Sequence, residues 1–151
     1  MQRKIQVRKF KDIDLPQVAQ LFDAYRQFYE ELADLKLATQ FISERVKNNE
    51  SVILVAHDDE GMLHGFCQLY PTFCSVLAQP IYVLYDLFVA PSARGEGVAT
   101  QLLEAAVAQG REDGKARLDL STAKTNHAAQ SVYEAQGWIR DDEFFTYNFS
   151  L

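Results

Sequence analysis

The sequence predicts one α/β domain over residues 1–151, built on a mixed, mostly antiparallel sheet of six to seven strands with helices on both faces. Three observations predict it. The length of 151 residues suits one domain that buries its own core. Strand-like apolar segments alternate with segments of helical spacing, and a glycine turn joins the longest apolar strand to a helix. The expected order is β-α-α-β-β-β-α-β-α-β-β.

The first fifty residues predict one strand and two helices. Residues 5–10 alternate apolar and polar side chains, which indicates a half-buried strand. Asp12 or Asp14 is expected to cap the first helix, in which apolar residues recur every three or four positions up to Tyr29. Thr39 is expected to open a shorter amphipathic helix, which ends at residues 48–50.

The middle of the chain predicts an antiparallel hairpin and a central strand. Residues 51–57 and 64–71 read as strands, with a turn at residues 58–61 between them. Residues 81–89 are apolar almost throughout, so this strand is expected in the sheet interior. A glycine turn at residues 94–97 then leads into a helix.

The last third predicts three more strands and one short helix. Residues 117–121 form the first of these strands, and Asn126 precedes the helix, which Gly137 ends. Trp138 and Ile139 are expected to begin one further strand, and residues 144–149 to form the last.

Composition disfavours several classes of protein. The net charge is −6 and no basic cluster is longer than Arg3-Lys4, which disfavours nucleic-acid and anionic-membrane partners. Cys67 and Cys74 stand seven apart, and the three histidines make no ligand spacing with them, so neither a disulfide framework nor a metal site is expected. No apolar run approaches the roughly 20 residues of a membrane span, so a cytoplasmic location is expected.

The segment from strand 81–89 through the glycine turn predicts an anion site. Glycines at positions 95 and 97 remove two Cβ atoms where a ligand must approach the backbone. The N–H groups of the following first helical turn and the positive end of its dipole point at such a ligand. A phosphate group is therefore expected there.

Two common glycine loops do not match this one. A dinucleotide loop needs a third glycine at the sixth position, which here is Thr100, and it follows the first strand of a βαβ unit. A nucleoside-triphosphate loop needs Gly-Lys-Ser/Thr, and neither Gly95 nor Gly97 is followed by lysine.

The pyrophosphate of coenzyme A is the third alternative. Arg94-Gly95-Glu96-Gly97-Val98-Ala99 follows the pattern Gln/Arg-x-x-Gly-x-Gly/Ala, although phasing the pattern on the two glycines would start it at Ser92. Downstream, Asn126-x-x-Ala129-x-x-x-Tyr133-x-x-x-Gly137-Trp138 forms a second motif. In both motifs and in element order the chain resembles the GCN5-related N-acetyltransferase (GNAT) superfamily. The resemblance covers essentially the whole chain.

This resemblance implies acetyl-CoA as acyl donor. Main-chain groups of the central strand would hold the pantetheine arm, loop amides would hold the pyrophosphate, and Asn126 would bond to pantetheine. Asn126 has an alternative interpretation as a plain helix N-cap, and Glu96 is an acidic departure beside the expected anion. The implied donor-binding residues are Leu87, Phe88, Val89, Arg94, Gly95, Gly97, Val98, Ala99, Thr100 and Asn126.

The resemblance also implies that Tyr133 is the general acid that protonates the departing thiolate. The acceptor amine, with a pKa of ~10.4, needs a base or a water chain to remove its proton. Asp86 is the only carboxylate in the central strand and hence the candidate base, although a structural carboxylate is the other interpretation. Alternation is expected to place Asp86 and Tyr85 on opposite faces of the sheet.

An aromatic and acidic acceptor pocket is expected around the first helix, suited to an alkylammonium group. Its candidates are Tyr25, Phe28, Tyr29, Glu30 and Glu31, with Tyr85 beside the reacting centre and Tyr70 and Phe73 near the hairpin end.

The resulting hypothesis is an N-acetyltransferase that acts on a primary amine, a small basic one in preference, by direct transfer in a ternary complex. No cysteine stands where a covalent acyl intermediate would form. A protein lysine or N-terminus as acceptor, or a non-catalytic acyl-CoA-binding module, are the alternatives. The family habit implies a homodimer.

Overall fold

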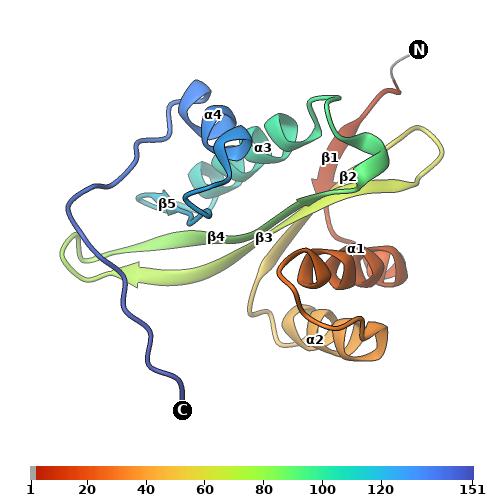
Figure 1. The fold of residues 1–151 in the computed structure, drawn as a ribbon, viewed down its shortest axis with the longest axis horizontal. Helices are drawn as coiled ribbons and strands as arrows, with labels where there is room; N and C mark the ends of the chain where they lie inside the picture. Colours follow the sequence, from red (N-terminus) through yellow and green to blue (C-terminus); the bar gives the residue numbers. More distant parts are fainter. Residues whose placement is uncertain (1–2) are drawn as a thin grey trace. The chain divides into compact units, whose positions relative to one another are not determined.

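The computed structural model describes residues 3–151, and these form two compact units, one up to Ser121 and one from Thr122 to Leu151 (Figure 1). The sheet, the glycine loop and three of the helices belong to the first unit, and one helix belongs to the second. One domain over residues 1–151 stays a prediction.

The first unit contains a five-stranded sheet, in which strands that follow one another in the chain are also neighbours in space. The first four strands are antiparallel, and the fifth runs parallel to the fourth. The strands are β1 (Gln6–Lys9), β2 (Val52–His57), β3 (Leu63–Cys74), β4 (Gln79–Val89) and β5 (Leu118–Asp119). The mixed, mostly antiparallel character expected from the sequence is therefore confirmed.

Helices cover both faces of this sheet. On one face α1 (Leu15–Phe28) and α2 (Leu35–Lys47) lie side by side, and on the other lies α3 (Val98–Glu112) (Figure 1). The face under α1 and α2 encloses an apolar core, because their buried positions meet the side chains of alternate strand residues. That core contains Val18, Phe22, Ala38, Ile42, Ile53, Val55, Leu63, Phe66 and Phe88.

The start of α2 differs from the sequence prediction, and α1 begins after the predicted Asp14 but without a cap from its side chain. The carboxylate of Asp34 accepts a hydrogen bond from the N–H of Leu37 at 3.0 Å, so α2 begins four residues before Thr39. Asp14 precedes α1 but does not cap it with its side chain. Its carboxylate instead accepts from the guanidinium of Arg8 at 2.7 Å and from the N–H of Lys11 at 2.8 Å.

A close approach between β3 and α3 positions the start of α3. A Cβ placed on Gly65 would lie 2.9 Å from the carbonyl oxygen of Phe88 and 3.2 Å from Cγ1 of Val98. Glycine at this position therefore lets the first turn of α3 pack directly on the strand pair β3–β4.

The second unit corrects the predicted strand count. It contains α4 (His127–Ala135), capped by Asn126, but residues 138–151 form no strand, so the described residues have five strands, not six or seven. Phe145, Tyr147 and Phe149 do alternate as the pattern required, yet each is exposed, Phe149 by 89%. An alternating pattern makes a strand only where a neighbour pairs its backbone, and none of the described strands pairs with this segment.

None of the helices within residues 3–151 combines the length and the apolar composition that a membrane crossing requires.

Candidate active site

The glycine loop leaves the end of β4 and enters α3. After Val89, a 3₁₀ turn at Pro91–Ala93 redirects the chain, and Gly95 and Gly97 follow with φ of 79° and 78°. A Cβ on either glycine would meet no atom within 4 Å, so both glycines face open space. A side chain at either position would fill part of that space. The N–H groups of Val98 and Ala99 lie in the first turn of α3, where the helix dipole is positive. This arrangement suits an anion.

β4 has a main-chain edge that β5 covers only in part. β5 pairs with β4 only at Tyr82 and Val83. The N–H of Ala90 donates to the carbonyl of His64 in β3 at 2.8 Å, so alternation turns the main chain of Leu87 and Val89 toward the other edge. The main chain of Phe88 faces β3, and its side chain is buried under α1 and α2.

Arg94 lies along the end of this strand. Its Nε donates to the carbonyl oxygen of Val89 at 3.2 Å, and its guanidinium carbon lies 5.6 Å from the centre of the Phe88 ring. These contacts hold the start of the loop against β4.

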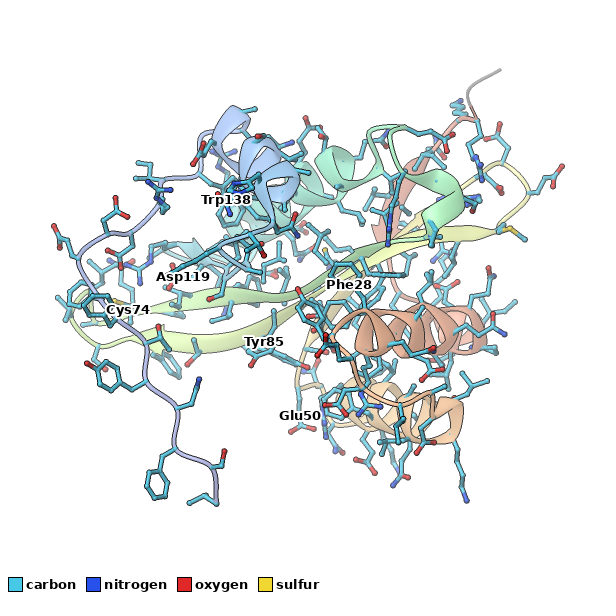
Figure 2. All side chains as sticks on the ribbon, in the orientation of Figure 1. Phe28, Glu50, Cys74, Tyr85, Asp119 and Trp138 are labelled. Atoms are coloured by element: carbon cyan, nitrogen blue, oxygen red, sulfur yellow. The ribbon has the colours of Figure 1, made fainter. Side chains whose placement is uncertain are left out.

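A β-bulge interrupts β4 next to this edge. Gln68 of β3 stands opposite Asp86, and the next residue, Leu69, stands opposite Leu84, so Tyr85 is an additional residue in β4. The predicted placement of Tyr85 and Asp86 on opposite faces is therefore wrong. The Tyr85 ring packs on Tyr70, with ring centroids 5.5 Å apart. Its side chain lies on the face of the sheet that carries α2, as Figure 2 shows.

Asp86 lies on that same face but is buried, with only 4% of its surface exposed. The side-chain amide of Gln68 donates to its Oδ2 at 2.6 Å, and the Gln68 carbonyl oxygen accepts from the Ser51 hydroxyl at 2.7 Å. Burial raises the pKa of the Asp86 carboxyl, and the hydrogen bonds from Gln68 and Tyr25 oppose this only in part. A carboxyl with a raised pKa binds a proton more readily near neutral pH.

Tyr25 of α1 connects Asp86 with the bulge. Its hydroxyl donates to the main-chain carbonyl of Tyr85 at 3.3 Å. Burial, and secondarily the charge of Asp86, raises the pKa of the Tyr25 phenol, so this hydroxyl stays protonated and acts as a donor.

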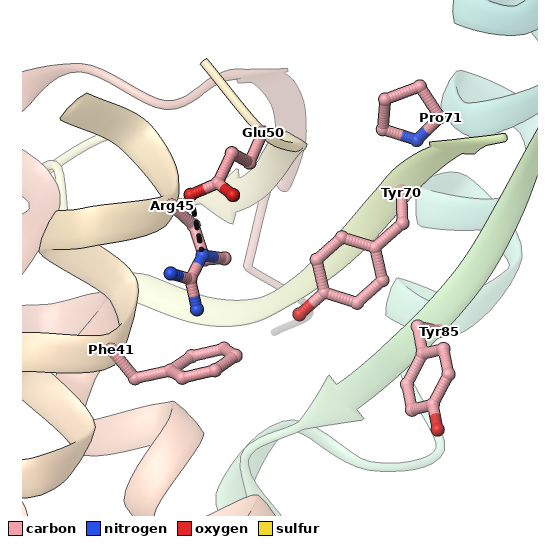
Figure 3. Close-up of a pocket in the computed structure, with 6 residues that line it drawn as sticks. All are labelled: Phe41, Arg45, Glu50, Tyr70, Pro71 and Tyr85. Atoms are coloured by element: carbon pink, nitrogen blue, oxygen red, sulfur yellow. Dashed lines mark hydrogen bonds and ion pairs between the residues drawn. The ribbon is translucent and has the colours of Figure 1, made fainter. Parts of the chain in front are cut away.

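An open groove of about 600 Å³ lies beside the bulge, between α2 and the strands β3 and β4 (Figure 3). Aromatic rings supply much of its wall, and one ion pair crosses its rim. The Nε of Arg45 lies 3.2 Å from Oε1 of Glu50, and the same guanidinium lies 4.4 Å from the centre of the Phe41 ring. The lining residues are Phe41, Arg45, Glu50, Tyr70, Pro71 and Tyr85.

The second unit holds the other two residues implied by the motifs. The side-chain oxygen of Asn126 accepts from the N–H of Ala129 at 3.2 Å, which caps α4. Tyr133 lies within α4, and its ring centroid is 6.3 Å from that of Trp138. Asn126 is therefore a helix N-cap, and its amide nitrogen can also donate to another group.

Comparison with known proteins identifies this arrangement. The model of the acetyltransferase (GNAT) family matches residues 16–138. The chain belongs to this family. It is 43% identical over 141 residues to an uncharacterized N-acetyltransferase of Bacillus subtilis (strain 168), which covers 93% of this chain and 94% of the relative. A solved probable acetyltransferase superposes with a TM-score of 0.90 at 37% identity, covering 97% of both chains.

A more distant structure shows the fold alone. An aminoglycoside N-acetyltransferase solved in complex with CoA has a TM-score of 0.82 at 20% identity and covers all of this chain. Together the family match and the relatives make this protein an N-acetyltransferase, and the sequence-based family assignment is confirmed.

The acetyltransferase groove contains only part of the predicted acceptor site. Tyr85 lines it, whereas Tyr29 and Glu30 lie at the exposed end of α1 and are not among its lining residues. The Tyr29 ring contacts Tyr25, with centroids 5.2 Å apart, and the Tyr25 hydroxyl in turn bonds to the carbonyl of Tyr85.

Sequence reasoning missed four of the six groove residues, Pro71 of β3 among them. Phe41 and Arg45 stand four apart on α2, a spacing that places two side chains on one helix face, and Glu50 follows the end of that helix. That spacing was the available signal, but it did not indicate which strand the helix face would meet.

Within residues 3–151, no three His, Cys, Asp or Glu side chains come together in a way that could hold a metal ion.

Proposed function

We propose that this acetyltransferase transfers the acetyl group of acetyl-CoA to a primary amine, a small basic amine in preference, by direct transfer in a ternary complex. One observation carries the proposal. β4 provides both the main-chain edge at Leu87 and Val89 and the groove residue Tyr85. Because a strand rises ~3.3 Å per residue, Tyr85 and Val89 lie about 13 Å apart along β4. A thioester held at Val89 and an amine held beside Tyr85 could therefore extend toward each other and meet.

The donor would occupy the loop and the open edge of β4. Main-chain N–H groups of Gly95, Gly97, Val98, Ala99 and Thr100 are the proposed pyrophosphate ligands. The N–H of Val89 is the proposed donor to the thioester oxygen, where negative charge develops during transfer. An aminoglycoside N-acetyltransferase with the same fold was solved in complex with CoA, which supports CoA as the carrier of the acetyl group.

The acceptor would enter the groove. Aromatic faces of Tyr70 and Tyr85 attract an alkylammonium group, whereas Arg45 covers the Phe41 ring and neutralises the carboxylate of Glu50 at the rim. Glu30, Glu31 and Asp34 supply acidic groups between α1 and α2. These groups favour a basic amine over an acidic one.

Asp86 is the proposed base for the amine. With a pKa of ~10.4, only about one amine in 2,500 is neutral at pH 7, which adds ~4.6 kcal/mol to the barrier. A carboxyl whose pKa is raised by burial accepts that proton more readily, directly or through water. The neutral amine then forms a bond to the acyl carbon, and the carbon–sulfur bond breaks.

Tyr133 is the proposed general acid for the departing thiolate, and the amide nitrogen of Asn126 the proposed donor to pantetheine. A phenol near pKa ~10 and a thiol near ~8.5 are close enough for proton transfer within a hydrogen bond. Replacing Tyr133 with phenylalanine is expected to lower the transfer rate about 100-fold or more while acetyl-CoA binding is retained. Tyr147→Phe, an exposed tyrosine of the same unit, is the matched control, and an unchanged rate in Tyr133→Phe would remove the assignment.

A homodimer and a cytoplasmic location complete the proposal. The exposed apolar side chains of Phe145, Tyr147, Phe149 and Leu151 support the dimer, because a second copy could cover them. Light scattering of the eluting protein in size-exclusion chromatography would measure the mass, and a monomer at all concentrations would count against it.

Calorimetric titration with acetyl-CoA, with NAD as control ligand, tests the proposed function. Micromolar binding of acetyl-CoA alone is expected. A thiol-release assay would then rank polyamines, amino acids, aminoglycosides and a lysine peptide as acceptors. Preference for NAD, or release with none of the amines, would contradict the proposal.

A further inference from the structure

The glycine loop carries a negative charge where an anion is expected. Glu96 stands between Gly95 and Gly97, two of the proposed pyrophosphate ligands. A carboxylate that extended into the loop would repel the ligand. The position of this side chain therefore matters for donor binding.

Arg3 binds both Glu96 and the start of the loop. Its Nε lies 3.2 Å from Oε1 of Glu96, and its Nη2 donates to the carbonyl oxygen of Ser92 at 3.1 Å. Its Nη1 lies 3.0 Å from Nδ1 of His64. One guanidinium thus joins the loop to a strand of the sheet.

His64 provides a rigid anchor for this guanidinium. Its side chain is buried in β3, with 3% of the residue exposed, and its Nε2 lies 2.8 Å from Oδ2 of Asp58. Because the Asp58 carboxylate can only accept, Nε2 carries the proton and Nδ1 accepts from Arg3. The main-chain carbonyl of His64 also accepts from the N–H of Ala90, directly before the loop.

From these contacts we infer that Arg3 is a positioning residue of the donor site: it turns the Glu96 carboxylate away from the pyrophosphate position and neutralises its charge. This inference rests on the proposed function, since it concerns how the proposed donor is held. Arg3 acts on the donor through Glu96, and its hydrogen bond to Ser92 holds the guanidinium in place. Loss of Arg3 would leave the loop backbone intact but release a negative charge beside the anion.

The test compares Arg3→Ala, Glu96→Gln and the double variant. Titration should show acetyl-CoA binding to Arg3→Ala weakened about tenfold, with Glu96→Gln close to the parent protein. The double variant should recover to within about twofold of the parent, because the charge that Arg3 neutralises is then absent. In kinetics, the Michaelis constant for acetyl-CoA should rise while the rate at saturation stays unchanged.

Acetyl-pantetheine separates this role from a general loss of structure, because it carries the thioester without the diphosphate. Its Michaelis constant should be the same for the parent protein and for Arg3→Ala. Arg111→Ala, which removes one positive charge at the other end of α3, about 20 Å along the helix, is the matched control and should bind acetyl-CoA as the parent does.

Three outcomes are informative. Absence of acetyl-CoA binding by the parent protein would overturn the proposed function and this inference together. Equal binding by the parent and Arg3→Ala would overturn the inference alone. Weaker binding that Glu96→Gln does not restore, or an equal loss with acetyl-pantetheine, would mean that Arg3 only stabilises the fold.

Discussion

The glycine loop and the groove beside Tyr85 lie on the same unit but are built from different groups. The loop presents main-chain N–H groups of consecutive residues at the start of α3, and its glycines hold positive φ. The groove presents side chains from α2, the segment after it, β3 and β4. A main-chain site depends on the local path of the backbone, whereas a side-chain site depends on how four separate segments meet.

This difference predicts opposite responses to mutation. The loop should be sensitive to any added Cβ at its glycines and tolerant elsewhere. The groove should lose individual contacts one at a time, with effects on the acceptor and not on the donor. Three variants test this contrast.

Gly97→Ala is expected to have the largest effect. At φ of 78° an L residue is strained, and its Cβ would enter the open space that the pyrophosphate is proposed to fill. Binding of acetyl-CoA should weaken about 100-fold or more by calorimetry.

Gly61→Ala is the matched control for that variant. Gly61 has φ of 84° in the β2–β3 turn, and a Cβ there also meets no atom within 4 Å. Both variants should lose stability by about 1–2 kcal/mol, but only Gly97→Ala should lose the donor. Equal donor binding by the two would mean that the loop does not hold it.

Asp86→Asn is expected to have the next largest effect. It should lower the turnover rate and raise the stability relative to the parent as pH increases to neutral. The amide keeps the acceptor for Gln68 but cannot take a proton, so the turnover rate should fall about 30-fold at neutral pH while acetyl-CoA binding is unchanged.

The stability effect of Asp86→Asn follows from the raised pKa of the carboxyl. Since the folded-state pKa lies above the unfolded value, the contribution of Asp86 to stability is full below the unfolded pKa of ~3.9 and is lost as pH rises through the folded pKa. The Tm of the variant minus that of the parent should therefore increase from acid to neutral pH. A constant Tm difference, with an unchanged rate, would contradict both assignments.

The fold could be predicted where the signal is local. Strand β4, the hairpin β2–β3 and α3 follow from contiguous apolar patterns and from the glycines at the loop. The last two predicted strands failed because pairing is not a local property. Residues 144–149 have the apolar alternation of a strand, but their backbone has no ladder in the described structure.

The same distinction applies to the site. The glycine loop, the proposed donor site, was visible in the sequence because its glycines, its helix start and its strand are adjacent. The bulge at Tyr85 was not visible, since an additional residue in β4 is defined only by its register with β3. Nor could Phe41 and Arg45 be placed opposite Tyr70 without knowing how α2 crosses the sheet.

Tyr85→Ala is expected to have the smallest effect of the three variants and to separate the two sites most cleanly. The Tyr85 side chain is 66% exposed, lines the groove and contacts Tyr70, so its removal should cost an aromatic face without disturbing the core. The Michaelis constant for a basic amine should rise about tenfold, since cation–π contacts contribute roughly 0.5–2 kcal/mol, while the dissociation constant of acetyl-CoA stays the same. Met62→Ala, an exposed apolar residue in the β2–β3 turn, provides the control. A weaker donor affinity with an unchanged acceptor constant would mean that the groove belongs to the acetyl-CoA site, because only shared contacts could couple Tyr85 to the donor.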